Sequence, residues 1–249
     1  MKRKNMAKGV SSVSKGTVLF DTLKSVSKRT VPFDTFDTFM DLLFPPSLYC
    51  HCCGNLIDQT RTYGLCDHCI RHIRWDRGAP LVRDGMVMVR CAEYGIYERS
   101  LIFALKYNGH RYIARSIAEM MADRLALTSL EFDVIVPIPM HKTKQRKRGF
   151  NHAALIGKYL ADRTGTVCLP EALVRTQDTR PMRGLSPTER ENNIRGHVSP
   201  GPQARELLGK RVLLLDDFFT TGATARECRR ALAQAEPADV MLLAFAAKY

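Results

Sequence analysis

Four apolar runs of strand length recur along the chain, at residues 86–94, 132–139, 212–215 and 238–246. The run at 212–215 contains no polar residue, which is typical of a strand buried on both faces of a parallel sheet. Between these runs, apolar residues recur at helical spacing over residues 98–107, 113–127 and 223–235. This alternation of strands and helices predicts an α/β fold, with a mostly parallel sheet flanked by helices.

The run at 212–215 leads directly into two carboxylates and a turn rich in hydroxyls. The acidic pair, Asp216 and Asp217, offers oxygens that only accept hydrogen bonds, so a vicinal diol suits it and a phosphate does not. The phosphate turn follows and consists of Thr220, Thr221, Gly222, Ala223 and Thr224. Its hydroxyls, its glycine and the free N–H groups of the next helix suit a phosphate. At the carboxyl edge of a sheet, this combination predicts a sugar-phosphate site.

A strongly basic segment follows the run at 132–139. It holds five cations, Lys142, Lys144, Arg146, Lys147 and Arg148. We expect it to form a loop at the same sheet edge as the phosphate turn, where it would bind pyrophosphate. Lys106 lies at a helix end and is a weaker candidate for the same role. The alternative is that these charges form an ordinary solvated face.

The segment at residues 175–198 is longer than most connections and is polar, with several prolines and glycines. Segments of this kind in compact domains often act as lids that exclude water from a reaction. The alternative is plain disorder. We therefore expect either a lid over the sugar-phosphate site or a disordered connection.

Two CxxC units predict a metal site. They place Cys50 and Cys53 before a short insert, and Cys66 and Cys69 after it, with a glycine directly behind Cys53. Such spacing is typical of a structural, four-thiolate Zn²⁺ site in a small zinc ribbon. The residues inside the two units, His51, Cys52 and His68, are competent ligands but are expected to point away. A redox role for the thiols is the alternative.

The charge of the chain favours polyanionic partners. Lys and Arg number 38 against 25 Asp and Glu, which gives a net charge of +13. Nucleic acid and phosphorylated ligands suit such a balance, although solubility alone also explains it. Residues 1–34 read as a basic flexible extension, either an arm for nucleic acid or a solvated leader. No apolar run approaches the roughly 18 residues that a membrane helix needs, so we expect a cytoplasmic protein without membrane insertion.

Five motifs together resemble the ComF family of type I phosphoribosyltransferase-like proteins with an N-terminal zinc ribbon. They are Phe44-Pro-Pro with the two CxxC units, Leu105-Lys-Tyr-x-Gly109, Val136-Pro-Ile-Pro-Met-His141, Arg148-Gly-Phe-Asn151, and Leu215-Asp-Asp-x-x-Thr-Thr-Gly-Ala-Thr224. The resemblance runs from about Phe39 to the C-terminus. It implies a zinc-ribbon module at residues 35–80 and a phosphoribosyltransferase-like domain at 81–249. Within the first of these, the apolar spacing over residues 36–44 predicts a short helix that Pro45 and Pro46 end.

The resemblance also implies roles for the site residues. Asp216 and Asp217 would hold the ribose 2- and 3-hydroxyls of 5-phosphoribosyl-1-pyrophosphate at the reacting centre, and the turn from Thr220 to Thr224 would hold its 5-phosphate. Arg146 and Arg148, with Lys106 as a helper, would meet the pyrophosphate together with Mg²⁺. The reaction would be a displacement at C1 of the sugar.

One departure bears on turnover, because Met182 stands where family members commonly carry Gln. The function that the resemblance implies is handling of single-stranded DNA in competence and DNA uptake, alongside other DNA-uptake proteins. One alternative is a metabolic phosphoribosyltransferase acting on a small amine or nucleobase. The other is a sensor that binds phosphoribosyl pyrophosphate without turnover.

Overall fold

The computed structural model describes residues 48–58, 60–179 and 184–248. Three expectations lie outside these residues: the basic extension at 1–34, the short helix at 36–44, and the position of Met182. Pro46–Tyr249 form one compact unit, which contains all the features described below. In the part of the chain that is described, no helix is both long and apolar enough to cross a membrane.

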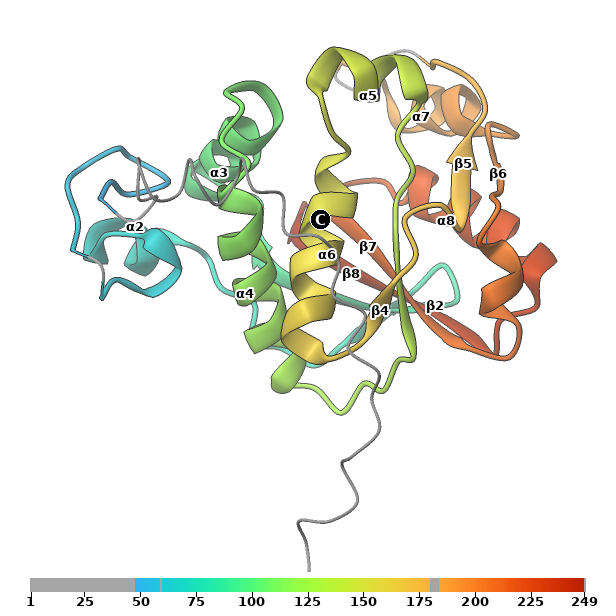
Figure 1. The fold of residues 1–249 in the computed structure, drawn as a ribbon, viewed down its shortest axis with the longest axis horizontal. Coiled ribbons are helices and arrows are strands. Elements are labelled where there is room, and N and C mark those ends of the chain that lie inside the picture. Colours follow the sequence, from blue (N-terminus) through green and yellow to red (C-terminus); the bar gives the residue numbers. More distant parts are fainter. Residues whose placement is uncertain (1–47, 59, 180–183, 249) are drawn as a thin grey trace, which may run out of the picture. The chain divides into compact units, whose positions relative to one another are not determined.

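The unit is built on a six-stranded sheet with the order β1-β2-β8-β7-β3-β4. Its strands are β1 (Leu81–Arg83), β2 (Met86–Glu93), β3 (Val134–Pro137), β4 (Val167–Cys168), β7 (Arg211–Phe219) and β8 (Asp239–Ala247). All neighbours run parallel except β1 and β2, which form an antiparallel hairpin. The predicted fold class, a mostly parallel sheet flanked by helices, is confirmed (Figure 1).

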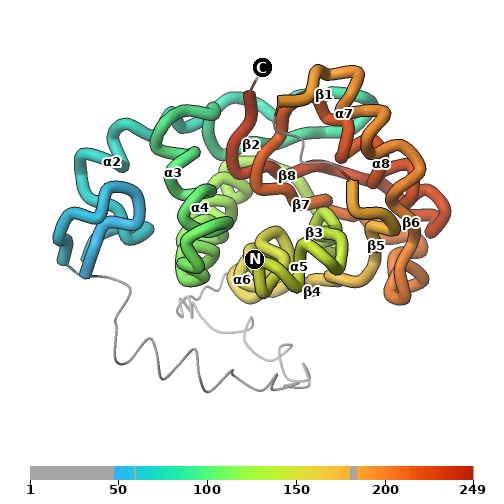
Figure 2. Tube along the Cα trace, turned by 90° about the horizontal axis from the view of Figure 1, so that it is seen from above, coloured from blue at the N-terminus to red at the C-terminus, as the bar shows by residue number. Residues whose placement is uncertain are grey.

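Helices cover both faces of this sheet (Figure 2). One face carries α3 (Ile96–Tyr107), α4 (Ile113–Ala126) and α6 (His152–Thr164), and the other carries α8 (Ala223–Leu232). The alternation of side chains along β7 divides the core accordingly. Leu213 and Leu215 pack among the first group of helices, and Val212 and Leu214 pack with α8.

The remaining elements are short. They are the 3-10 helices η1 (Thr62–Gly64), η2 (Ala204–Leu207) and η3 (Ala233–Ala235), the helices α2 (Asp67–His72), α5 (Lys142–Arg148) and α7 (Pro187–Ile194), and the hairpin of β5 (Leu173–Arg175) with β6 (Val198–Pro200). The predicted lid segment, residues 175–198, thus joins β5 to β6. Its described part contains α7, whose start carries a capping box of Ser186 and Glu189.

Two expectations about local structure were wrong. The basic segment is not a loop but the helix α5, because His141 caps its first turn and Gly149 ends it in the left-handed region, at φ +88°. The strand at 212–215 does not end before the acidic pair. It continues to Phe219, because β8 remains paired with it as far as Ala247.

Replacing a leucine of β7 tests how far the fold depends on this strand. Leu213→Ala removes a fully buried side chain, and we expect it to lower the free energy of unfolding by about 2–5 kcal/mol. Urea unfolding of zinc-loaded protein measures this. Leu208→Ala, at a side chain that is 66% exposed, is the control and should leave the unfolding midpoint nearly unchanged. Equal midpoints for both variants would contradict the central position of β7.

Candidate functional site

The phosphate turn closes one end of a small pocket. The pocket is lined by Arg190, Asp216, Phe218, Phe219 and residues 220–225. Gly222 adopts φ +77° and leads into α8 as its N-cap, a conformation that residues with a Cβ rarely adopt. The last two residues of the turn, Ala223 and Thr224, are therefore also the first two of α8, where helix N–H groups are free. The structure brings Asp216 together with all five residues of the turn in the lining of one pocket.

Two arginines hold the turn in place. From α7, Arg190 Nη1 donates to Thr220 Oγ1 at 2.9 Å. From α8, Arg226 Nη1 donates to the Thr221 carbonyl at 2.9 Å and to Asp84 Oδ2, also at 2.9 Å. Arg226 was not among the predicted residues. It lies four residues after Gly222, and this spacing on α8 brings its side chain back against the phosphate turn. That spacing was the signal available in the sequence.

The pocket itself is small and partly open. Its volume is about 30 Å³, which is room for about one water molecule. A phosphoribosyl group is larger than this volume, so most of such a ligand would lie outside the pocket.

The two carboxylates of the acidic pair belong to different sides of β7. Asp216 lies on the same face of β7 as Val212 and Leu214. It is half-buried and lines the pocket at the phosphate turn. Asp217 lies on the opposite face, with Leu213 and Leu215, and is buried toward α3 and α6. The structure therefore brings only one member of the pair, Asp216, to the pocket lining.

Asp217 is the centre of a buried charge cluster. Its Oδ2 lies 2.6 Å from Lys106 Nζ and 3.4 Å from His152 Nε2. Burial alone would raise the pKa of Asp217, but the Lys106 ammonium and His152 together lower the pKa well below its usual range. Burial and the negative charge of Asp217 raise the pKa of the neighbouring Asp216 carboxyl. The pair therefore carries its negative charge mainly on Asp217.

His152 joins this cluster to α5 and was not predicted from the sequence. Its Nδ1 lies 3.1 Å from Arg148 Nη1. A guanidinium only donates, so Nδ1 accepts and the ring proton sits on Nε2, facing Asp217. Burial lowers the pKa of His152, which agrees with this neutral tautomer. The position of His152, one residue after the N-cap of α6, was the available signal.

Two of the three predicted pyrophosphate residues lie in the buried charge cluster, and the third stands apart from it. Lys106 pairs with Asp217, and Arg148 contacts His152 and lies over the ring of Tyr107 at 5.1 Å. Arg146 is exposed on α5. None of the three lines the pocket at the phosphate turn. Instead, Lys144 ties α5 to the start of the lid segment, with its Nζ 2.5 Å from the Thr179 carbonyl oxygen.

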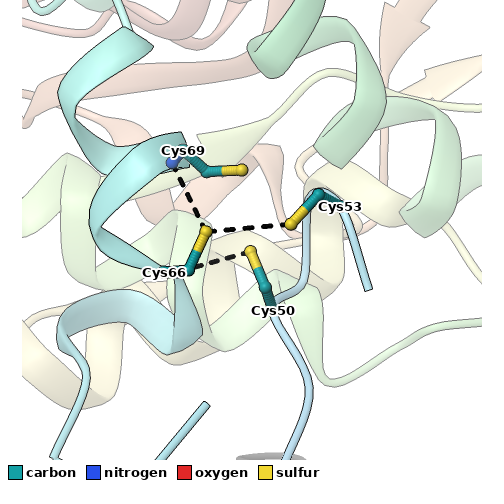
Figure 3. Close-up of side chains that lie close together, drawn as sticks. All are labelled: Cys50, Cys53, Cys66 and Cys69. Atoms are coloured by element: carbon teal, nitrogen blue, oxygen red, sulfur yellow. Dashed lines mark hydrogen bonds between the residues drawn. The ribbon is translucent and has the colours of Figure 1, made fainter. Parts of the chain in front are cut away.

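The four predicted metal ligands come together in a cysteine cluster formed by Cys50, Cys53, Cys66 and Cys69 (Figure 3). Their sulfurs all lie within 4.8 Å of one another, and those of Cys53 and Cys66 are 3.7 Å apart. Zn–S bonds of about 2.3 Å in a tetrahedron put neighbouring sulfurs about 3.8 Å apart. The cluster therefore fits one Zn²⁺ ion, with no open position for catalysis.

The competing ligands inside the two CxxC units have other contacts. His51 lies with its Nδ1 3.0 Å from Ser116 Oγ on α4, and Cys52 Sγ contacts the Tyr97 carbonyl oxygen at 3.7 Å. His68 Nε2 lies 3.1 Å from the Tyr97 hydroxyl. These three side chains anchor the cysteine-bearing segment on α3 and α4.

Comparison with known proteins finds relatives that are named for competence or for DNA utilization. It is 27% identical to Competence protein F of Haemophilus influenzae over 74% of this chain and 78% of that protein. It is 25% identical to DNA utilization protein YhgH of Escherichia coli over 68% and 84%. No family model matches. The resemblance to the ComF family is confirmed.

Solved structures that resemble this chain include two enzymes. One is the glutamine phosphoribosylpyrophosphate amidotransferase of B. subtilis, which is 21% identical, with a TM-score of 0.37 over 53% of this chain and 25% of that one. The other is the adenine phosphoribosyltransferase of Saccharomyces cerevisiae, which is 14% identical, with a TM-score of 0.35 over 59% and 74%.

Removing one thiol of the cysteine cluster tests the zinc assignment. We expect Cys66→Ser to reduce bound zinc from about one equivalent to less than about half, because three thiolates bind the ion far more weakly than four. Metal analysis of freshly purified, reduced protein measures this. Cys52→Ser is the matched control and should keep its zinc, since Cys52 faces Tyr97. Equal losses in both variants would mean that the ligand set is wrong.

Proposed function

We propose that this chain binds 5-phosphoribosyl-1-pyrophosphate with Mg²⁺ and acts in the cytoplasm in handling single-stranded DNA during uptake. The observation that carries the proposal is that Arg190, Asp216 and the phosphate turn line one pocket together. Hydroxyls, helix N–H groups and a guanidinium are the donors that a phosphate monoester needs. A carboxylate beside them supplies the acceptor that a ribose hydroxyl needs.

The charges of the site suit a magnesium complex of a sugar pyrophosphate. Asp216 would offer a carboxyl oxygen to a ribose hydroxyl, and Mg²⁺ bound beside it would favour loss of its proton. The ion would also supply charge neutralisation for a leaving pyrophosphate. Asp217, held by Lys106, would keep a fixed negative charge beneath the sugar, where positive charge develops during displacement at C1. Arg148 and Arg146 on α5 would meet the pyrophosphate once the lid segment moves.

The DNA part of the proposal is supported by the relatives and by charge. One relative is named a competence protein and the other a DNA utilization protein. The net charge of +13 favours a polyanionic partner. Other proteins of the DNA-uptake machinery are the expected protein partners.

A second candidate function is a sensor that binds phosphoribosyl pyrophosphate without turning it over. The hydrogen bond from Arg190 to Thr220 favours it, because a ligand phosphate would take over this contact and displace α7. Such a change in position is what a partner protein would detect.

Calorimetry with phosphoribosyl pyrophosphate and Mg²⁺ tests the pocket. We expect Asp216→Ala to weaken binding at least about tenfold, or about 1.4 kcal/mol, through loss of the ribose contact. Asp239→Ala, at an exposed carboxylate where β8 begins, is the matched control for the change in charge. Unchanged affinity in both Asp216→Ala and the Asp216→Ala, Asp217→Ala double variant would contradict the site.

Release of pyrophosphate separates enzyme from sensor. In the presence of single-stranded DNA or a small amine, a transferase should release pyrophosphate continuously, and the rate should fall in Asp216→Ala. A sensor should bind the ligand and release none.

The salt dependence of DNA binding tests the DNA part of the proposal. The logarithm of the affinity for single-stranded DNA should fall with the logarithm of the salt concentration, with a slope of about −0.7 for each phosphate contacted. Absence of DNA binding at low salt would refute that part of the function.

A further inference from the structure

A second pocket, which we call the aromatic pocket, lies between the cysteine-bearing segment and the α/β core. Its walls include Tyr63, Trp75 and Arg77 on one side, and Asp123, Arg124 and Leu127 from α4 and its end on the other. Its volume is about 370 Å³, within the range of roughly 300–1,000 Å³ that is usual for small-molecule sites. It shares no lining residue with the pocket at the phosphate turn.

Two aromatic rings form one wall and are fixed by their polar atoms. The Tyr63 hydroxyl donates to Asp123 Oδ2 at 2.7 Å, and Trp75 Nε1 donates to the Ile70 carbonyl at 3.0 Å. The ring centroids lie 5.9 Å apart. Tyr63 also has φ +58°, which is uncommon for a bulky residue and concentrates at binding sites. The pocket thus holds two immobilised aromatic surfaces.

A buried cation forms another part of the wall. Arg124 is only 6% exposed and lines the pocket. Its Nε and Nη2 donate to the carbonyls of Arg90 and Gly78, at 3.0 and 2.5 Å. Asp76, which also lines the pocket, forms its ion pair with Arg90, and the positive charge of Arg124 helps to lower the pKa of Asp76. Arg124 therefore shares this one carboxylate with Arg90. An anionic ligand would supply Arg124 with a counter-charge of its own.

The surrounding charges favour the same kind of ligand. Asp123 already accepts from Tyr63 and lies 3.7 Å from Arg163. Arg77 is exposed and lines the pocket as a second cation. A ligand that joins a flat ring to an anionic group satisfies both walls at once. A nucleotide has this construction, and stacking on aromatic side chains tolerates any base.

We propose that the aromatic pocket binds one nucleotide unit of single-stranded DNA. The base lies against Tyr63 and Trp75, and the adjoining phosphate lies toward Arg77 and Arg124. This proposal rests on the DNA-handling part of the function proposed above. It assigns DNA to a place separate from the sugar-phosphate site.

The chain contains a reporter at this position, because Trp75 is its single tryptophan. The full-length, zinc-loaded protein is titrated at low salt with an oligothymidylate of about twelve nucleotides. We expect the thymidine oligomer to quench Trp75 fluorescence. An abasic oligomer of the same length should bind more weakly and leave the fluorescence nearly unchanged. Fluorescence anisotropy of labelled oligomers measures binding independently of Trp75.

A matched pair of variants tests the location. Leu127→Glu introduces a carboxylate at the edge of the aromatic pocket, in place of a side chain that is 70% exposed. Leu208→Glu introduces one outside the pocket, in place of a side chain that is 66% exposed. Both change the net charge equally, and neither removes a buried group. We expect Leu127→Glu to weaken oligothymidylate binding at least about tenfold, and Leu208→Glu to have less than about a twofold effect.

The outcomes separate this proposal from the function on which it rests. If the oligomer binds by anisotropy but Trp75 fluorescence and Leu127→Glu show no effect, the aromatic pocket is not the site and DNA handling stands. Equal quenching by the abasic oligomer also overturns the proposal. No binding of any oligomer at low salt overturns the DNA function itself, while calorimetry with phosphoribosyl pyrophosphate still reports on the sugar-phosphate site.

Discussion

The candidate site depends on how strand β7 is paired. From Val212 to Leu215 it has β3 on one side and β8 on the other, and beyond Leu215 only β8 continues. The strand therefore carries its last residues past the end of its neighbour, at the carboxyl edge where ligands of parallel sheets bind. Alternation then sends Asp216 toward the phosphate turn and Asp217 toward α3 and α6. Half-buried and buried environments for the two carboxylates follow from this one arrangement.

The sequence predicted the parts of the molecule that local pattern controls. The apolar runs located the long strands, and the spacing of the cysteines identified all four members of the cysteine cluster. It did not show that α5 is a helix, since seven mostly charged residues have no apolar periodicity and their helix depends on capping by His141 and Gly149. The contacts of His152 and Arg226 were also missed. Both residues act across elements that are distant in sequence, and no local pattern records such a contact.

The cysteine-bearing segment is part of the core rather than a separate attachment. Cys50, Leu65, Cys69 and Ile73 share one apolar cluster with residues of α3 and α4. Zinc binding would therefore stabilise the surface on which the aromatic pocket is built, because Tyr63 lies between the two CxxC units and Ile70 directly follows the second. This arrangement connects metal, pocket and α/β domain within a single folding unit.

Arg226 has a mechanical consequence for the site. One guanidinium contacts the β1–β2 hairpin through Asp84, the phosphate turn through the Thr221 carbonyl, and α7 through Glu191 at 3.3 Å. These three segments lie far apart in the chain, and none can shift far without breaking a bond to the same side chain. Displacement of α7 by a ligand would therefore loosen the hairpin at the edge of the sheet. Amide hydrogen exchange at β1 would therefore report events at the phosphate turn, which this arginine joins to the hairpin.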